Sequence, residues 1–379
     1  MSSQLSLKDN GQAIVIDLGA SLTKSGFSGK FVPSTVTPSL IGRYKQSDPF
    51  EESIGTDTLI AGSEALEKQG LLRLSYPSEH GSIPDFENYE YLLSTIFSNE
   101  LSVDPDGRNV MLVEPTIFTK QTKMKLVQFF FEKLNVKNLY FINTALASLY
   151  ASGTATGIVV ESGEGSTSVT PIVDSRVFLS AQRITELGGI DITNRLKHLL
   201  RLKGHAFPSS SDWQTVKLIK EKTCFISEHL NEDRKKIGSN DFETFYTLPD
   251  HKTISINEER FLSPEILFHP LLVDCEEPAV DKLFVDSISA MSSSLRATLA
   301  SSIYLSGGST LFKGFPERLI SSIRIRLQPE FPLKIKAPKD RILSPWIGAA
   351  VLASQDIVQQ FWISQKKYET EGMRLFFDM

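Results

Sequence analysis

GIVVESGEGSTS, residues 157–168, is the stretch that decides the fold of this chain. The apolar run 158–160 leads into Glu161 and then into a Gly-x-Gly turn flanked by small hydroxyl residues. A buried strand delivers a phosphate-binding turn in this way, because glycines let the backbone approach an anion with its N–H groups exposed. The stretch therefore predicts a phosphate site at the end of a buried strand.

A second copy of the pattern lies near the N-terminus. Residues 13–16 (AIVI) run into Asp17 and then into the turn 18–21 (LGAS). Two copies of strand, acid and glycine turn predict a duplicated fold that holds a nucleotide between its halves. A third glycine loop, residues 305–310 (LSGGST), fits the same cleft and is expected to hold the base and ribose.

Composition excludes several classes of protein. The 379 residues are enough for two to three domains, and the hydrophobic fraction of 41% and charged fraction of 22% are ordinary for a soluble globular chain. A net charge of −5 without a long Lys/Arg run gives no sign of non-specific nucleic-acid binding. The polar N-terminus and the lack of a long apolar run predict no signal peptide and no membrane insertion, so we expect cytosol or nucleus.

The cysteines and histidines give no support for a zinc site. Cys224 and Cys275 are the two cysteines, which favours a reducing compartment and inert, buried thiols. The six histidines form no HxxH or HExxH spacing, so a zinc site is not supported.

The chain alternates strand and helix patterns, which is the rhythm of an α/β domain. The first half predicts strands over 109–113 and 138–142 and helices over 119–134 and 145–151. After Gly188-Gly189 we expect a helix over 194–202 whose N-terminus is available to an anion. Ser209 to Asp212 predict the cap of a further helix, which carries Lys217 and Lys220.

Three other segments carry expectations. Residues 44–58 predict an exposed loop, because they are polar and acidic and contain a proline. Leu271 to Val273 form an apolar stretch that either docks on a neighbouring subunit or lies in the core of its own chain, and burial is favoured. Residues 346–360 are expected to return to the first domain, with hinge strands near Thr144 and 344–346.

Several motifs in a fixed order resemble the actin family across nearly the whole chain. Besides the two acid-glycine turns they are residues 76–81 (YPSEHG), 148–153 (SLYASG), 305–308 (LSGG), 346–348 (WIG) and 352–354 (LAS). The resemblance implies an actin-like ATPase fold of the α/β class, with two duplicated α/β domains around a nucleotide cleft. It places the first, outer domain at 1–151 plus 344–379 with an insertion at about 39–75. The second, inner domain is placed at 152–343 with an insertion at about 188–278.

The resemblance also implies ATP or ADP with Mg²⁺ as ligands, and a set of residues that bind them. Asp17 and Glu161 would hold the metal through water. The residues implied for the nucleotide are Asp17, Gly19, Ala20, Ser21, Lys24, Glu161, Gly163, Glu164, Gly165, Gly189, Lys220, Glu221, Gly307, Gly308 and Ser309.

Some positions depart from the actin pattern, and most departures concern hydrolysis. Thr144 stands where actin has the glutamine that positions the attacking water, and Ser168 where actin has an assisting histidine. Glu161 and Glu164 replace two aspartates. Ala20 replaces a phosphate-contacting serine, and Ile342 a lysine near the base. Because each positioning or charge-stabilising group can contribute a factor of about 10² to 10³ in rate, we assign no catalytic residue and expect weak or absent hydrolysis.

Within the family, four segments are similar to the centractin branch, which forms the short filament of dynactin. They are residues 209–211 (SSS), 295–299 (LRATL), 306–315 (SGGSTLFKGF) and 366–369 (KKYE). This likeness implies a non-enzymatic cytoskeletal subunit that self-assembles and joins other dynactin subunits and dynein. Such a subunit supports microtubule transport in the cytoplasm, as in nuclear migration, spindle positioning and vesicle movement. Two alternatives stay open: a subunit of a chromatin-remodelling complex, or a sugar-kinase-like phosphotransferase.

Overall fold

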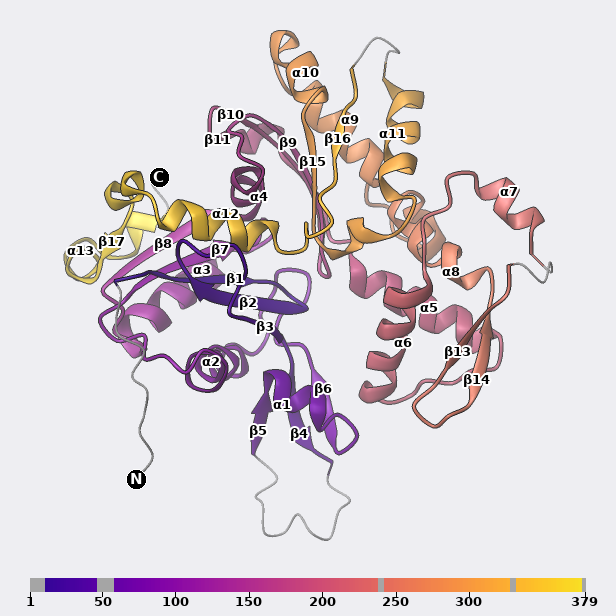
Figure 1. Cartoon of the computed structure of the whole chain (residues 1–379), viewed down its shortest axis with the longest axis horizontal. Helices are drawn as coiled ribbons and strands as arrows, with labels where there is room; N and C mark the ends of the chain where they lie inside the picture. Colours follow the sequence, from indigo (N-terminus) through magenta and orange to yellow (C-terminus); the bar gives the residue numbers. More distant parts are fainter. Residues whose placement is uncertain (1–10, 46–57, 238–241, 328–331, 377–379) are drawn as a thin grey trace.

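The computed structural model describes residues 11–45, 58–237, 242–327 and 332–376. Two α/β lobes lie beside each other in Figure 1, the first on the left and the second on the right. A small sheet, here called the small subdomain, extends below the first lobe. Within the described ranges no helix is both long enough and apolar enough to cross a membrane.

A six-stranded sheet of order β17-β8-β7-β1-β2-β3 forms the first lobe. Its central strand β1 is buried at every residue, because cores lie against both of its faces. Ile14 and Ile16 belong to the core on one face, and Val15 to the core on the other, as the two-residue repeat of a strand requires. The strands are β1 Ile14–Leu18, β2 Leu22–Phe27, β3 Thr35–Pro38, β7 Asn109–Glu114, β8 Asn138–Asn143 and β17 Ile363–Ser364.

The sheet of the second lobe repeats this arrangement. In the first lobe β1 forms a hairpin with β2 and pairs in parallel with β7; in the second, β9 forms a hairpin with β10 and pairs in parallel with β15. The strands are β9 Gly157–Ser162, β10 Thr167–Val173, β11 Arg176–Val177, β12 Arg183–Thr185, β15 Ile303–Ser306 and β16 Ile335–Lys336. Because each lobe has the same hairpin and the same parallel neighbour strand, the predicted α/β fold with a duplicated core is confirmed.

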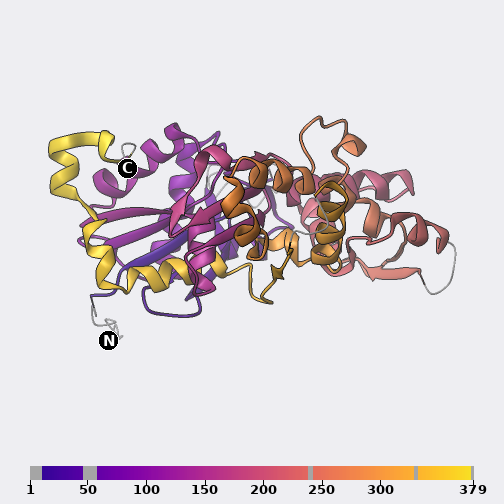
Figure 2. The ribbon, with the colours of Figure 1, turned by 90° about the horizontal axis from the view of Figure 1, so that it is seen from above.

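Helices cover the sheet of the first lobe on both faces. The predicted helix 119–134 is two elements, because α3 passes into a π-helical turn over Phe129–Lys133, and α2 likewise passes into Ile96–Glu100. The helices are α2 Phe86–Thr95, α3 Lys120–Gln128, α4 Thr144–Ala151, α12 Ser344–Ala353 and α13 Gln365–Glu371. In Figure 2 the C-terminal segment, in yellow, runs along the lower edge of this lobe and then turns up around its left end.

The second lobe adds a helical region and a hairpin. The predicted capping of α6 is confirmed: Ser209 Oγ accepts from the Asp212 N–H, and the Asp212 carboxylate accepts from the Ser209 N–H. The helices are α5 Gly189–Leu202, α6 Ser210–Thr223, α7 Leu230–Lys235, α8 Glu259–Leu262, α9 Val280–Ser289, α10 Ser293–Ala300 and α11 Phe315–Arg326. The hairpin pairs β13 Thr244–Thr247 with β14 Thr253–Ile256.

The small subdomain is a three-stranded sheet, β5-β4-β6, with one short helix. Its elements are β4 Ile41–Tyr44, β5 Leu59–Ala61, α1 Gly62–Glu67 and β6 Leu72–Ser75. Leu40, Ile60, Leu72 and Leu74 give it a core of its own. The loop predicted over 44–58 falls mainly on residues 46–57, which lie outside the described residues.

Two expectations are corrected here. The hinge positions are not strands: Thr144 and Ser344 are the first residues of α4 and α12. Burial of the stretch 271–273 was also wrong in part, because Leu271 is 75% exposed and Leu272 37% exposed. The turn Pro270–Val273 buries Pro270 instead, so Pro270 rather than Leu271 faces the interior. Just before it, the buried Glu265 carboxylate accepts from Arg318 at 2.9 Å and is paired with His269 at 2.6 Å, which anchors the segment.

Candidate functional site

A cavity of about 580 Å³ opens where the two lobes meet. It is lined by the turn after β1, the turn after β9, the loop after β15 and the C-terminal half of α6. The sequence-predicted residues that line it are Asp17, Gly19, Ala20, Ser21, Lys24, Thr144, Glu161, Gly163, Glu164, Gly165, Lys220, Glu221, Gly307, Gly308 and Ser309. Segments far apart in the sequence therefore meet at one site.

The two acid-glycine turns face each other across this cavity. A Cβ placed on Gly165 would lie 3.6 Å from the Cβ of Ala20, so the turns approach to van der Waals distance. The third loop joins the second turn, because the Ser309 hydroxyl donates to the Gly163 carbonyl at 3.0 Å. Gly307 takes a positive φ of 86° against the Ser162 carbonyl, where a side chain would not fit.

Asp17 and Lys24 form an ion pair at the first turn. They are register partners in the β1–β2 hairpin, and Lys24 Nζ lies 2.9 Å from Asp17 Oδ2. Gly19 leaves room for this lysine, because a Cβ there would lie 3.2 Å from Lys24 Nζ. The first turn thus places a buried lysine beside the backbone of a glycine turn at the cavity wall, which suits phosphate.

Glu161 has no such partner among the described residues. Its register partner in the β9–β10 hairpin is Ser168, which is neutral. Burial and the nearby charge of Asp17 raise the pKa of Glu161 to about 7, although a hydrogen bond from Thr144 at 3.1 Å and the charge of Lys24 oppose the rise. Its Oε2 atom is buried and accepts no hydrogen bond from the part of the chain that the structure describes. An under-satisfied carboxylate beside Asp17 fits a divalent cation, because Mg²⁺ prefers oxygen ligands.

We expect Glu161→Gln to reduce the pH dependence of stability. The Glu161 carboxyl titrates near its ordinary value of 4.5 in the unfolded chain and at about 7 in the folded one. Between those values the folded chain binds more protons, so the free energy of unfolding falls as pH rises, by about 1 to 3 kcal/mol from this group.

Urea unfolding in EDTA, at about pH 5 and about pH 8, measures this dependence. The surface variant Glu64→Gln, whose carboxylate pairs with Lys68, is the control. An equally steep dependence in Glu161→Gln would show that this carboxyl is already ionised in the folded chain.

Glu164 on the second turn has the opposite electrostatic setting. Burial raises its pKa, but the charges of Lys220 and Lys217 hold it below the ordinary value. Lys220 Nζ lies 3.3 Å from one carboxylate oxygen, and Lys217 Nζ lies 3.8 Å from the other. Glu164 is therefore an ionised anchor between two lysines, which is less suited to a cation than Glu161.

Gly189 and Ser168 do not line the cavity. Gly189 lies directly behind it, where its carbonyl accepts from Lys220 at 2.8 Å and a Cβ would meet the Glu164 carboxylate. Ser168 is buried in β10 between Glu161 on β9 and Ile184 on β12. Sequence analysis placed both among the site residues because it cannot separate lining residues from the layer behind them.

The N-terminus of α5 is not free for an anion, contrary to expectation. The Gly189 N–H donates to the Gly163 carbonyl and the Ile190 N–H to the Glu164 carbonyl, both at 2.9 Å. The Gly188 N–H donates to the Asp191 carboxylate. This helix end therefore supports the second turn from behind.

Sequence analysis missed several lining residues. Cys224, interpreted as an inert core thiol, lines the cavity, and burial raises its pKa to about 12, so it stays a neutral thiol. Cys224 follows Lys220 by four residues at the end of α6, so helical spacing from the predicted Lys220 is the signal that could have found it. Other apolar lining residues are Ile117, Phe118, Leu311 and Phe312. Ile342, which sequence analysis placed near the base, lines the cavity as expected.

The described part of the chain has no group of three His, Cys, Asp or Glu side chains that could enclose a metal ion. A cation held by Asp17 and Glu161 would therefore keep most of its waters, as Mg²⁺ commonly does. Comparison with protein-family models matches residues 8–376 to the model described as Actin. The match covers the lobes, the small subdomain and every lining residue of the cavity.

Proposed function

Since the chain belongs to the actin family, we propose that it is a nucleotide-binding structural subunit of an actin-like filament. The observation that carries this proposal is the meeting of three glycine loops, Lys24 and Lys220 around one cavity. Its volume of about 580 Å³ lies within the range of small-molecule sites. The ligand is ATP or ADP, with Mg²⁺.

The cavity has a charged end for the phosphates and an apolar end for the base. Backbone N–H groups of the two turns and the Lys24 ammonium group bind the phosphates. Leu311, Phe312 and Ile342 give the side chains for the base. Bound Mg²⁺ would neutralise part of the phosphate charge, and Asp17 and Glu161 would hold the ion through its water ligands.

We propose that hydrolysis is weak or absent, so the protein acts as a structural subunit rather than as an enzyme. The Thr144 hydroxyl, at the cavity wall, donates to Glu161. Ser168 lies behind the wall in β10. Neither side chain supplies the positioning of a nucleophile on which phosphoryl transfer depends.

More specifically, we propose that the chain is a subunit of a dynactin-like filament in the cytoplasm that supports dynein-driven transport. Four sequence segments similar to the centractin branch support this assignment. The exposed Leu271, on an anchored loop, supports subunit contacts.

Purification of the tagged chain from cell extract at near-native expression tests the proposal. Dynactin subunits among its partners, together with ATP or ADP extracted from the same sample, are the expected result. Partners from a remodelling complex would replace the dynactin assignment and leave the structural role. Rapid phosphorylation of any member of a panel of sugars and polyols would overturn the structural role.

Asp17→Asn is expected to remove most of the Mg²⁺ dependence of nucleotide binding. The substitution keeps the shape of the side chain but removes the charge that holds the hydrated cation, a change that typically costs about 10- to 100-fold in metal affinity. Titration of a fluorescent ATP analogue in Mg²⁺ and in EDTA measures the effect. Asp286→Asn, on the exposed side of α9 in an ion pair with Lys282, should behave as wild type. An unchanged ratio of the two affinities in Asp17→Asn would remove Asp17 from the metal site.

A further inference from the structure

One face of α6 spans the gap between the two lobes. The Leu74 N–H, on β6 of the small subdomain, donates to Ser210 Oγ at 2.9 Å. One turn further along α6, Trp213 packs edge-on against Tyr76 with ring centroids 5.4 Å apart. The Tyr76 hydroxyl also exchanges hydrogen bonds with the Gln214 amide. The N-terminal half of α6 thus holds the small subdomain.

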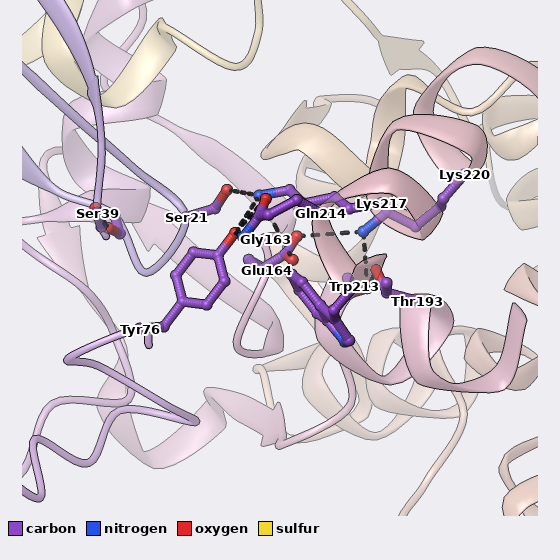
Figure 3. A network of polar contacts seen from close by, with 12 residues as sticks. Ser21, Ser39, Tyr76, Gly163, Glu164, Thr193, Trp213, Gln214, Lys217 and Lys220 are labelled. Carbon is purple, nitrogen blue, oxygen red and sulfur yellow. Dashed lines mark hydrogen bonds and ion pairs between the residues drawn. The ribbon is translucent and has the colours of Figure 1, made fainter. Parts of the chain in front are cut away.

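Lys217 follows on the same face, one turn later. Figure 3 shows its side chain directed across the gap to Ser21 and Tyr76. Its Nζ atom donates to the hydroxyl of Ser21 on the first turn and to the Tyr76 hydroxyl at 3.1 Å. It also lies 3.8 Å from Glu164 on the second turn. Burial lowers the pKa of this lysine, but the charge of Glu164 and the contact with Tyr76 raise it above its ordinary value, so Lys217 stays charged.

The next turn of α6 enters the cavity. Lys220 and Glu221 line it, as do Ser21 and Glu164, whereas Lys217 stands just outside. Lys217 therefore bridges both turns at the mouth of the site. On α6 it lies between the residues that contact the small subdomain and those that line the cavity.

We propose that Lys217 is a latch that holds the lobes together over the phosphate side of the cavity and thereby slows nucleotide release. The proposal rests on nucleotide binding at this cavity and adds the residue that controls exchange. Its partners Ser21 and Tyr76 lie in the first lobe and small subdomain, while its own helix lies in the second lobe, so breaking these bonds separates the lobes before it unfolds either of them.

The first test is the release rate of a pre-bound fluorescent ATP analogue, chased with excess ATP. Lys217→Met keeps the length of the side chain and removes its charge, and should release the analogue at least about tenfold faster, the factor for one lost charged hydrogen bond. Lys217→Arg should restore slow release at least in part. Lys222→Met, the same change on an exposed residue of α6, should leave the rate unchanged. Tyr76→Phe, which keeps the ring on Trp213, should give an intermediate rate.

The second test needs no nucleotide and so separates the latch from the proposed function. Nitroxide labels on the exposed positions Glu67 of α1 and Arg201 of α5, in a Cys275→Ser background, report the distance between the small subdomain and the second lobe. Lys217→Met should lengthen or broaden the distance distribution, and Lys222→Met should not. An unchanged distribution in Lys217→Met, or an unchanged release rate, overturns the latch. A shifted distribution in a protein that binds no analogue supports the latch and rejects nucleotide binding.

Discussion

Gly348→Ala is expected to lower the free energy of unfolding by about 2 to 4 kcal/mol, because α4 and α12 cross at this residue without space for a methyl group. A Cβ on Gly348 would overlap the Ala147 carbonyl oxygen and lie 2.9 Å from the Ala151 nitrogen. Both obstacles are backbone atoms of a helix, which cannot move aside as a side chain can. In an unobstructed helix the same change would instead stabilise the protein by about 0.5 to 1 kcal/mol.

Urea unfolding of Gly348→Ala and wild type measures the difference. Gly70→Ala is the matched control, since a Cβ on Gly70 would meet nothing within 4 Å and its φ is not positive. A Gly348→Ala protein as stable as wild type would mean that α4 and α12 lie further apart than described. The site is informative because the same region is tied to the central sheet: Trp346 Nε1 donates to the Val15 carbonyl at 3.0 Å.

The core of the fold could be predicted from the sequence because its signals are local. An apolar strand, an acid and a glycine turn are neighbours in the chain, and the hairpins β1–β2 and β9–β10 form where the pattern occurs twice. The cap of α6 is equally local, since Ser209 and Asp212 are three residues apart. Such patterns need no knowledge of what lies across the molecule.

The remaining features depend on contacts between distant residues. Leu271 is exposed while its neighbour Pro270 is buried, and the ion pair of Glu265 with the distant Arg318 anchors the segment, which nothing in the apolar stretch itself reveals. The N-terminus of α5 is occupied because the second turn docks on it from another segment. Lys217 reaches Ser21, nearly two hundred residues earlier in the chain, across the gap between the lobes. Sequence spacing indicates the face of α6 on which Lys217 lies but not what that face meets.

Thr144→Gln is expected to raise the rate of ATP hydrolysis by about 100-fold, the lower end of the factor of about 10² to 10³ that one well-placed group can contribute. Thr144 is the first residue of α4, whose start is fixed by the Asn143 side chain accepting from the N–H groups of Ala145 and Leu146. The backbone at Thr144 is thus rigid and at the cavity wall, but its short hydroxyl is bonded to Glu161. A glutamine at this position extends further into the cavity and offers a donor and an acceptor to a water.

The control for this gain is Thr144→Val, which keeps the shape of the side chain and removes only the hydroxyl. If the hydroxyl supplies no positioning for a water, single-turnover phosphate release in saturating Mg-ATP should be as slow in Thr144→Val as in wild type and faster only in Thr144→Gln. A slower Thr144→Val together with an unimproved Thr144→Gln would show that the threonine is itself catalytic, and the protein would then be an ATPase. The expected pattern would instead mean that hydrolysis is slow because the side chain at position 144 is too short to position a water, while the two turns still bind the phosphates.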